Sequence, residues 1–252
     1  MTLHVIARAA NGYTEKFGIP RQSGRAVSVV TRIVFEPAFR RPEALRGIEG
    51  FSHLWLIWGF SANERSSRKG GSNEKKGSGE STLCTGWSPT VRPPRLGGNT
   101  RLGVFATRSP FRPNELGLSS VRLERMEQTA EAGTVLVVSG ADLMDGTPIY
   151  DIKPYLPYTD IHSDATAGFA EAGSDYRLAV EWEPEAENRL PEAVKRDLQD
   201  ILAEDPRPAY HNDPGRLYGL SYAGWNIRFR VSGNTLCVTA ADRRTNTNPG
   251  KH

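Results

Sequence analysis

The sequence predicts a mainly β chain with some α+β structure, in which an N-terminal β-barrel precedes a small C-terminal α+β domain. Short segments rich in Val, Ile and Trp follow one another at close spacing, with Gly, Pro and Asn between them. Convincing long helices are absent from this first part, and the pattern changes beyond residue 160. We therefore expect one domain over residues 1–160 and a second over residues 165–252.

The strands of the first domain are predicted from runs of β-branched and aromatic residues. They are expected at Ala26–Glu36, Leu54–Phe60, Thr100–Thr107, Leu118–Glu127, Thr134–Asp142 and Pro148–Tyr155. A short helix is expected around Pro42–Ile48. Many short strands separated by turn signals are typical of a closed or nearly closed barrel.

Residues 62–86 interrupt this pattern with a stretch dominated by Ser, Gly, Lys and Glu. Such a segment buries too little apolar surface to offset its ordering entropy, which predicts a mobile insertion. Its basic residues leave a second interpretation open, in which the insertion contacts nucleic acid.

The second domain is predicted to contain one amphipathic helix and a hairpin. Apolar residues recur on one helical face over Pro191–Glu204. Strands are expected at Ala223–Val231 and Thr235–Ala241, joined by a turn at residues 232–234.

The charge is uneven along the chain of 252 residues, whose formal net charge is +3. Residues 1–160 carry a net charge of +6 and the remainder −3. A basic first part favours a polyanionic or phosphate-bearing partner, although a solubilising surface gives the same pattern.

Several classes are excluded by what the sequence lacks. No apolar run approaches the ~20 residues of a membrane helix, and Arg8 and Glu15 stand where a signal peptide needs apolar residues. Cys84 and Cys237 form no CxxC pair, which predicts free thiols in a reducing cytoplasm and no metal site. No GxGxxG follows a strand, so a Rossmann-type site has no support.

Arginines in proline-rich loops are the first candidate site residues. Prolines restrict the backbone and hold the guanidinium groups, which bind carboxylates or phosphates through paired hydrogen bonds. The arginines in question are Arg92, Arg95, Arg108 and Arg112. The alternative is a set of solvated loop arginines.

Acidic and aromatic residues gather over residues 142–158. Asp142, Asp145 and Asp151 lie close in sequence to Tyr155 and Tyr158. Proline-flanked tyrosines make rigid faces on which a base stacks, whereas turn aspartates and core tyrosines are the plainer interpretation.

Taken together, several long and unusual segments resemble the TsaA-like (TrmO) family of tRNA methyltransferases. These segments are Glu15–Gln22, Arg46–Trp55, Arg92–Asn99, Gly103–Asn114, Asp145–Tyr158 and Asp205–Tyr210. The resemblance implies a β-barrel class of S-adenosylmethionine enzyme that works as a homodimer. It also implies methylation of the exocyclic nitrogen of threonylcarbamoyladenosine at position 37 of threonine tRNAs.

The resemblance also implies which residues bind each ligand. The cofactor residues would be Pro20, Arg21, Gln22, Ser61, Arg108, Leu118, Gly140, Ala141, Asp142 and Leu143. The tRNA substrate would be bound by Arg92, Arg95, Arg112, Asp205, Arg207 and Tyr210. Three departures stand out: Ser61-Ala62 replaces a usual His-Gln, the stretch 62–86 is longer than usual, and Asn114-Glu115-Leu116-Gly117 replaces Asn-Pro-Ile-Gly.

Methyl transfer to this nitrogen predicts a catalytic carboxylate. The nitrogen lone pair is delocalised, so its proton must be removed or polarised before attack. We expect Asp151 in this role, with Tyr155 orienting the base. A methyltransferase of another RNA or a nucleotide-like metabolite, and a non-catalytic RNA-binding barrel, remain the alternatives.

Overall fold

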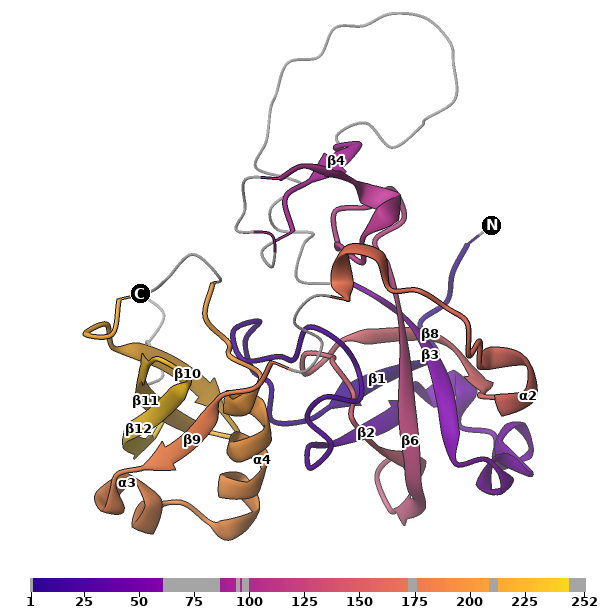
Figure 1. The fold of residues 1–252 in the computed structure, drawn as a ribbon. Helices are drawn as coiled ribbons and strands as arrows, with labels where there is room; N and C mark the ends of the chain where they lie inside the picture. Colours follow the sequence, from indigo (N-terminus) through magenta and orange to yellow (C-terminus); the bar gives the residue numbers. More distant parts are fainter. Residues whose placement is uncertain are drawn as a thin grey trace, which may run out of the picture.

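The first part of the chain folds into a six-stranded sheet that closes on itself. The computed structural model describes residues 2–60, 87–93, 96, 100–171, 176–208 and 213–244. The six strands are β1 (Ala7–Ala10), β2 (Val30–Phe35), β3 (His53–Gly59), β6 (Leu116–Thr129), β7 (Gly133–Ser139) and β8 (Pro148–Pro154). They pair in the order β1-β2-β7-β6-β3-β8, and β8 returns to β1 to close the barrel (Figure 1). The prediction of a mainly β chain with few helices is confirmed.

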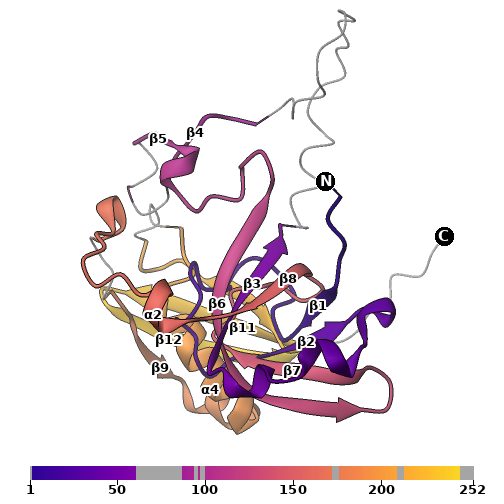
Figure 2. The same cartoon turned by 90° about the vertical axis from the view of Figure 1, so that its right-hand side faces the viewer.

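The interior of the barrel follows from alternation along the strands. In β3, Leu54, Leu56 and Trp58 are buried, while Trp55 and Ile57 between them are only half-buried. Because successive side chains of a strand point to opposite faces, the first set fills the barrel and the second lies outside. Figure 2 shows β3 between β6 and β8, the two strands with which it pairs.

Two expected strands differ from the structure. The first strand begins at Val30 instead of Ala26, because residues 26–29 form a turn whose Ala26 and Val29 are buried in the core of the second unit. The strand expected over Thr100–Thr107 is wrong for most of its length. Only β5 (Leu102–Gly103) pairs there, with β4 (Thr90–Val91), and the 3-10 helix η6 (Val104–Ala106) follows at once.

Short 3-10 helices connect β2 to β3. They are η1 (Pro37–Phe39), η2 (Pro42–Leu45) and η3 (Ile48–Gly50). The helix expected around Pro42–Ile48 is thus a 3-10 helix that ends at Leu45. Gly47, with a φ of +88°, turns the chain before η3 begins.

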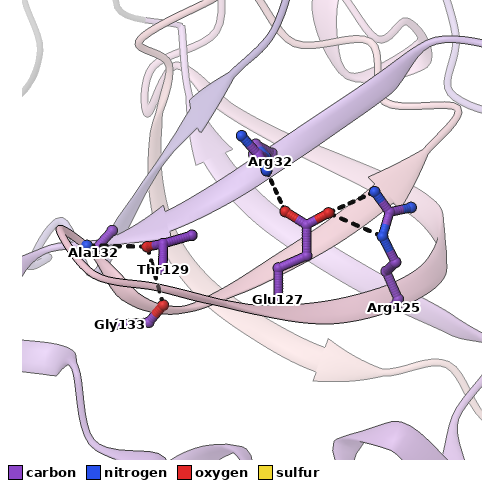
Figure 3. Close-up of polar contacts among 6 residues, drawn as sticks. All are labelled: Arg32, Arg125, Glu127, Thr129, Ala132 and Gly133. Atoms are coloured by element: carbon purple, nitrogen blue, oxygen red, sulfur yellow. Dashed lines mark hydrogen bonds and ion pairs between the residues drawn. The ribbon is translucent and has the colours of Figure 1, made fainter.

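A charged network lies across the outer surface of β2, β7 and β6. Glu127 on β6 accepts hydrogen bonds from Arg32 on β2 and from Arg125 (Figure 3). These hydrogen bonds lower the pKa of the Glu127 carboxyl below its usual value. Because both guanidinium groups are more than half exposed, the network contributes little to stability.

The second unit is a four-stranded sheet with two helices. Its order is β10-β11-β12-β9, and β9 joins parallel to β12. Helix α4 buries Leu198, Ile201 and Leu202, which agrees with the helix expected over Pro191–Glu204. The elements are β9 (Ala179–Trp182), α3 (Pro184–Arg189), α4 (Glu192–Ala203), β10 (Tyr218–Tyr222), β11 (Trp225–Ser232) and β12 (Thr235–Arg243).

Two short helices follow β8 and precede β9 along the chain, namely α2 (Pro157–Asp160) and η7 (Gly168–Ala170). None of the helices in the described ranges has both the length and the apolar character to cross a bilayer. The sequence did not predict β1, β9, β10 and α3, which are short or lack a clear apolar period.

The loop between β1 and β2 joins the two units. Tyr13 in this loop forms a bridge with Tyr222 of β10, and Tyr13, Ala26 and Val29 belong to the apolar core of the second unit. The Arg25 guanidinium pairs with Glu204 at 2.8 Å, and Arg177 reaches the same carboxylate. The loop therefore fixes residues 18–24 against both units.

Candidate functional site

Two glycine-containing loops cross at the centre of the candidate site. The Gly24 N–H donates to the Gly140 carbonyl at 2.8 Å. Both glycines have positive φ, +78° and +73°. A Cβ on Gly140 would lie 3.1 Å from the Gly24 Cα, so the two backbones meet where a side chain would separate them. The crossing brings the predicted cofactor segments 20–22 and 140–143 together.

Asp142 lies two residues after Gly140 of this crossing and contacts strand β6 through Ser119. Its Oδ1 accepts a hydrogen bond from the Ser119 hydroxyl at 2.5 Å, and Ser119 accepts one from the Trp58 indole N–H at 2.9 Å. Burial raises the pKa of the Asp142 carboxyl above its ordinary value, although the Ser119 hydrogen bond and the positive charge of Arg108 oppose this shift. The carboxylate is thus held in one orientation by a buried hydrogen-bonded chain.

Gly117 makes room for this chain. A Cβ at Gly117 would lie 2.3 Å from Cε2 of Trp58, so only glycine lets the indole reach Ser119. Sequence analysis missed Trp58 and Ser119. The available signal was a serine at an inward position of a strand, opposite Leu56.

A third segment supplies a cation to the same place. Arg108 donates through Nη1 to the Gln22 side-chain oxygen at 2.5 Å. Together with its electrostatic effect on Asp142, this contact places three predicted cofactor residues, Gln22, Arg108 and Asp142, in one cluster.

Arg21 turns from that cluster toward the second unit. Its Nη2 donates to the Arg207 carbonyl at 2.9 Å. Arg207 in turn makes two hydrogen bonds to the Asp205 carboxylate. Its Nε donates to Oδ1 at 2.8 Å, and its Nη2 donates to Oδ2 at 2.9 Å. The positive φ of Asp205, +48°, turns the chain after α4 and permits this pairing. Two predicted substrate residues therefore brace each other beside a predicted cofactor residue.

A cavity of about 390 Å³ lies between these segments. Residues 16–21 form one wall, including Pro20 and Arg21, and residues 201–206 form the other, including Asp205. Cavities of this size accommodate small organic ligands. The cavity therefore connects the loop of the predicted cofactor site with the loop of the predicted substrate site.

Two further predicted residues, Leu118 and Asp151, lie on the outer face of the barrel. Leu118 and Asp151 flank Ile57 in register, and Leu118 is 57% exposed. The Asp151 carboxylate accepts from the Ile152 N–H and lies 3.4 Å from the Lys153 Nζ. Tyr155 packs against Trp55, with ring centres 5.4 Å apart. The hydrogen bonds and ion pair found for Asp151 involve its own strand and do not reach the Asp142 cluster.

The predicted arginines of the long loop have distinct surroundings. Arg92 is exposed, whereas Arg112 donates through Nη1 to the Thr107 carbonyl at 2.8 Å. Other predictions fall outside the described residues, so the structure does not place them. They are Ser61, the insertion over 62–86 with Cys84, Arg95 and Tyr210.

Comparisons with known proteins match both units. The tRNA-methyltransferase O N-terminal domain matches residues 8–161, and the TrmO C-terminal domain matches residues 175–244. The tRNA (adenine(37)-N6)-methyltransferase of Escherichia coli (strain K12) is 39% identical over 242 residues, covering 92% of this chain and 94% of that protein. The tRNA (adenine(37)-N6)-methyltransferase of Eikenella corrodens is 49% identical over 191 residues, covering 75% and 96%.

The architecture has a matching solved structure as well. The crystal structure of TrmO from Pseudomonas aeruginosa aligns with a TM-score of 0.71 at 32% identity, over 96% of this chain and 98% of that one. The fold, the site and these relatives define an S-adenosylmethionine-dependent methyltransferase, for which S-adenosylmethionine is the expected cofactor. The chain belongs to the tRNA-methyltransferase O family.

The groups at the loop crossing fit this cofactor. S-adenosylmethionine carries an ammonium group and ribose hydroxyls that donate, and a carboxylate that accepts. The site presents a half-buried carboxylate at Asp142, a guanidinium at Arg108 and an amide at Gln22. The donor and acceptor groups of the crossing thus have counterparts on the cofactor.

Proposed function

We propose that this chain transfers the methyl group of S-adenosylmethionine to the exocyclic nitrogen of threonylcarbamoyladenosine at position 37 of threonine tRNAs. The relatives' printed activity on adenine 37 supports the reaction class. The observation that carries the finer proposal is the cavity of about 390 Å³ beside the cofactor loop. Arg21 in its wall is a suitable partner for the carboxylate of a threonyl group.

Cofactor binding is assigned to the loop crossing. Asp142 accepts from donor groups of the cofactor, and Arg108 faces its carboxylate. When bound, the cofactor supplies an electrophilic methyl group on a positively charged sulfur. The protein mainly aligns the two reactants and excludes water, because a direct displacement needs no covalent enzyme intermediate.

Proton removal from the nucleophilic nitrogen is assigned to Asp151. The carboxylate is half-exposed on the face that it shares with Leu118, and the Lys153 ammonium lies beside it. A base must reach the proton of a bound adenosine, which an outward-facing carboxylate allows. Tyr155, which packs against Trp55, is proposed to orient this catalytic base.

We also propose that the enzyme acts as a homodimer in the cytoplasm. The exposed Leu118 and the outward position of Asp151 support a second copy that completes the site on this face. Sedimentation of the full chain measures this directly, and a monomer at working concentration would contradict it.

The reaction is tested with purified protein, labelled S-adenosylmethionine and threonine tRNA that carries or lacks the threonylcarbamoyl group. We expect label in adenosine 37 of the modified tRNA alone. Equal transfer to both tRNAs would contradict the substrate proposal, and transfer to neither would contradict the function.

Replacing Asp151 with Asn tests the proposed base. We expect turnover to fall about 10²-fold or more, the range of general base catalysis, while the cofactor dissociation constant changes little. Single-turnover methylation and calorimetry measure the two quantities. Asp164→Asn, at an exposed aspartate outside the site, is the control. Unchanged turnover in Asp151→Asn would remove the residue from this role.

A further inference from the structure

The segment from residue 87 to residue 114 carries charge of one sign only. It contains five arginines, at positions 92, 95, 101, 108 and 112, and no Asp, Glu or Lys. Its described parts, with β4 and β5, project from the barrel in both views (Figures 1 and 2). A projecting segment with this composition attracts polyanions.

Large aromatic side chains are exposed on the same segment. Phe105 is 71% exposed, Phe111 57% and Trp87 41%. The rings of Trp87 and Phe105 lie 5.8 Å apart at an angle of 39°. Trp87 and Phe105 thus form an exposed aromatic pair, and contiguous exposed apolar surface marks an interaction site.

The backbone around Phe105 is well held although its side chain is exposed. Neighbouring Val104 is 1% exposed, and its N–H donates to the Pro89 carbonyl at 2.9 Å. Thr107 closes the next turn, its hydroxyl donating to the Val104 carbonyl at 2.8 Å. The ring is therefore presented on a fixed support, which reduces the entropy lost when it binds a partner.

Arg112 connects the charge and the aromatic surface. Its guanidinium carbon lies 5.9 Å from the Phe105 ring centre while Nη1 holds the Thr107 carbonyl. A guanidinium over an aromatic ring combines cation–π attraction with donors that remain available to phosphate. Arg101, which donates to the Thr90 hydroxyl, extends the positive charge toward β4.

We propose that this aromatic-arginine surface, formed by Trp87, Arg92, Arg101, Phe105, Phe111 and Arg112, binds single-stranded RNA and stacks an unpaired base on Phe105. Proteins bind single strands by combining stacking on aromatic rings with cations along the backbone. Phe105 lies three residues before Arg108 of the cofactor cluster, so the stacked base is a neighbour of the methylated nucleotide. This inference rests on the proposed function and adds the residues that hold the RNA.

The charge favours RNA over a protein partner. An interface with a second copy of this chain would bring like-charged arginines near each other unless acidic groups faced them, and residues 87–114 supply none. RNA supplies both the phosphates and the unpaired bases that this surface is suited to contact.

The test measures binding of a synthetic anticodon stem-loop RNA to the full chain, at one fixed salt concentration. We expect Phe105→Ala to weaken binding about tenfold to hundredfold, the range for loss of one stacked base. Phe105→Leu, which stays apolar but loses the aromatic face, should weaken it similarly, and Phe105→Tyr should restore it. Phe39→Ala, at an exposed phenylalanine of η1, is the matched control.

Parent-like binding by Phe105→Leu would overturn the proposal, because an apolar contact would then suffice. A variant that alters sedimentation of the protein alone, with unchanged RNA affinity, would show an interface between copies and overturn it too. Cofactor calorimetry confirms that each variant is folded. If the parent binds the stem-loop but leaves tRNA unmethylated, the proposed function fails while the Phe105 series still decides the stacking proposal.

Discussion

Asp142 combines burial with a fixed hydrogen-bonded orientation. The Ser119 hydroxyl and the Trp58 indole behind it occupy one carboxylate oxygen, while Arg108 approaches from the solvent side. A carboxylate that is desolvated in the free protein gains more from a polar ligand than a hydrated one does. We therefore expect Asp142 to strengthen cofactor binding and to lower the stability of the folded protein.

Asp142→Asn separates these two effects. Loss of a hydrogen-bonded charge, about 1.5–3 kcal/mol, should weaken cofactor binding roughly tenfold to hundredfold. Thermal stability at neutral pH should stay constant or rise, because the buried charge is removed. Calorimetry with S-adenosylmethionine and thermal unfolding measure the pair. Reduced stability together with parent affinity would contradict this account.

The sign of the pH effect follows from the raised pKa of Asp142. The folded protein holds this proton more tightly than the unfolded chain, so the group's stabilising contribution is full below its ordinary pKa. That contribution is lost as pH rises through the folded pKa. We compare the unfolding free energy of the parent with that of Asp142→Asn at each pH. The parent value minus the variant value should therefore decrease as pH rises through the folded pKa.

At this scale, sequence reasoning found residues but not their partners. Arg108 and Asp142 stood out as charged groups in Gly- and Pro-containing stretches, whereas Gln22 was implied only by the family resemblance. Ser119 and Trp58 could not be selected, since their role depends on the register of β3 against β6. A sequence pattern carries no direct information about that register.

Among the elements, the two crossing loops determine where the site forms. Neither loop belongs to a strand or helix, and their contact consists of backbone against backbone at Gly24 and Gly140. Glycine is required at both positions by φ, and at Gly140 by the lack of space as well.

Gly140→Ala and Gly146→Ala form a matched pair. Both glycines have positive φ, +73° and +76°, but only the Gly140 Cβ would meet neighbouring backbone. Each change should cost about 1–2 kcal/mol for the left-handed backbone. Gly140→Ala should lose additional stability and weaken cofactor binding, whereas Gly146→Ala should keep parent affinity. Denaturant unfolding and calorimetry test this, and equal effects of the two changes would refute it.

Element prediction succeeded where a period was clear. Strands β3 and β7 are runs of β-branched, aliphatic or aromatic residues, and helix α4 has a clear helical period. The segment Thr100–Thr107 failed because its β-prone residues have only a two-residue partner strand, so a 3-10 turn closes on Val104 instead. Strand propensity needs a neighbouring strand to become structure.

At the scale of the whole molecule, Glu204 joins the two units. Its carboxylate is 9% exposed and pairs with Arg25 from the first unit and Arg177 from the second, each at 2.8 Å. Ser28 adds a backbone N–H to the Asp200 carboxylate at 2.9 Å. The sequence could not predict this junction, because residues 25 and 204 are far apart along the chain.

Glu204→Gln should lower stability by about 1–3 kcal/mol, since two guanidinium groups lose a shielded anion. The melting temperature should fall by a few degrees. Glu127→Gln is the matched control, because Glu127 also pairs with two arginines (Figure 3). Those arginines are 54% and 57% exposed, so this change should leave the melting temperature nearly unchanged. Equal shifts in the two variants would show that the Glu204 ion pairs stabilise the protein no more than the Glu127 ion pairs do.

The burial of Tyr13, Ala26 and Val29 in the second unit also affects how the protein matures during translation. The ribosome makes these residues before β10, β11 and β12, the strands whose side chains cover them. A nascent chain that stalls after residue 160 would leave these apolar groups exposed and the segment with Pro20–Gln22 unanchored. Such a chain is therefore expected to be a target for chaperones and proteases until the strands of the second unit have been made.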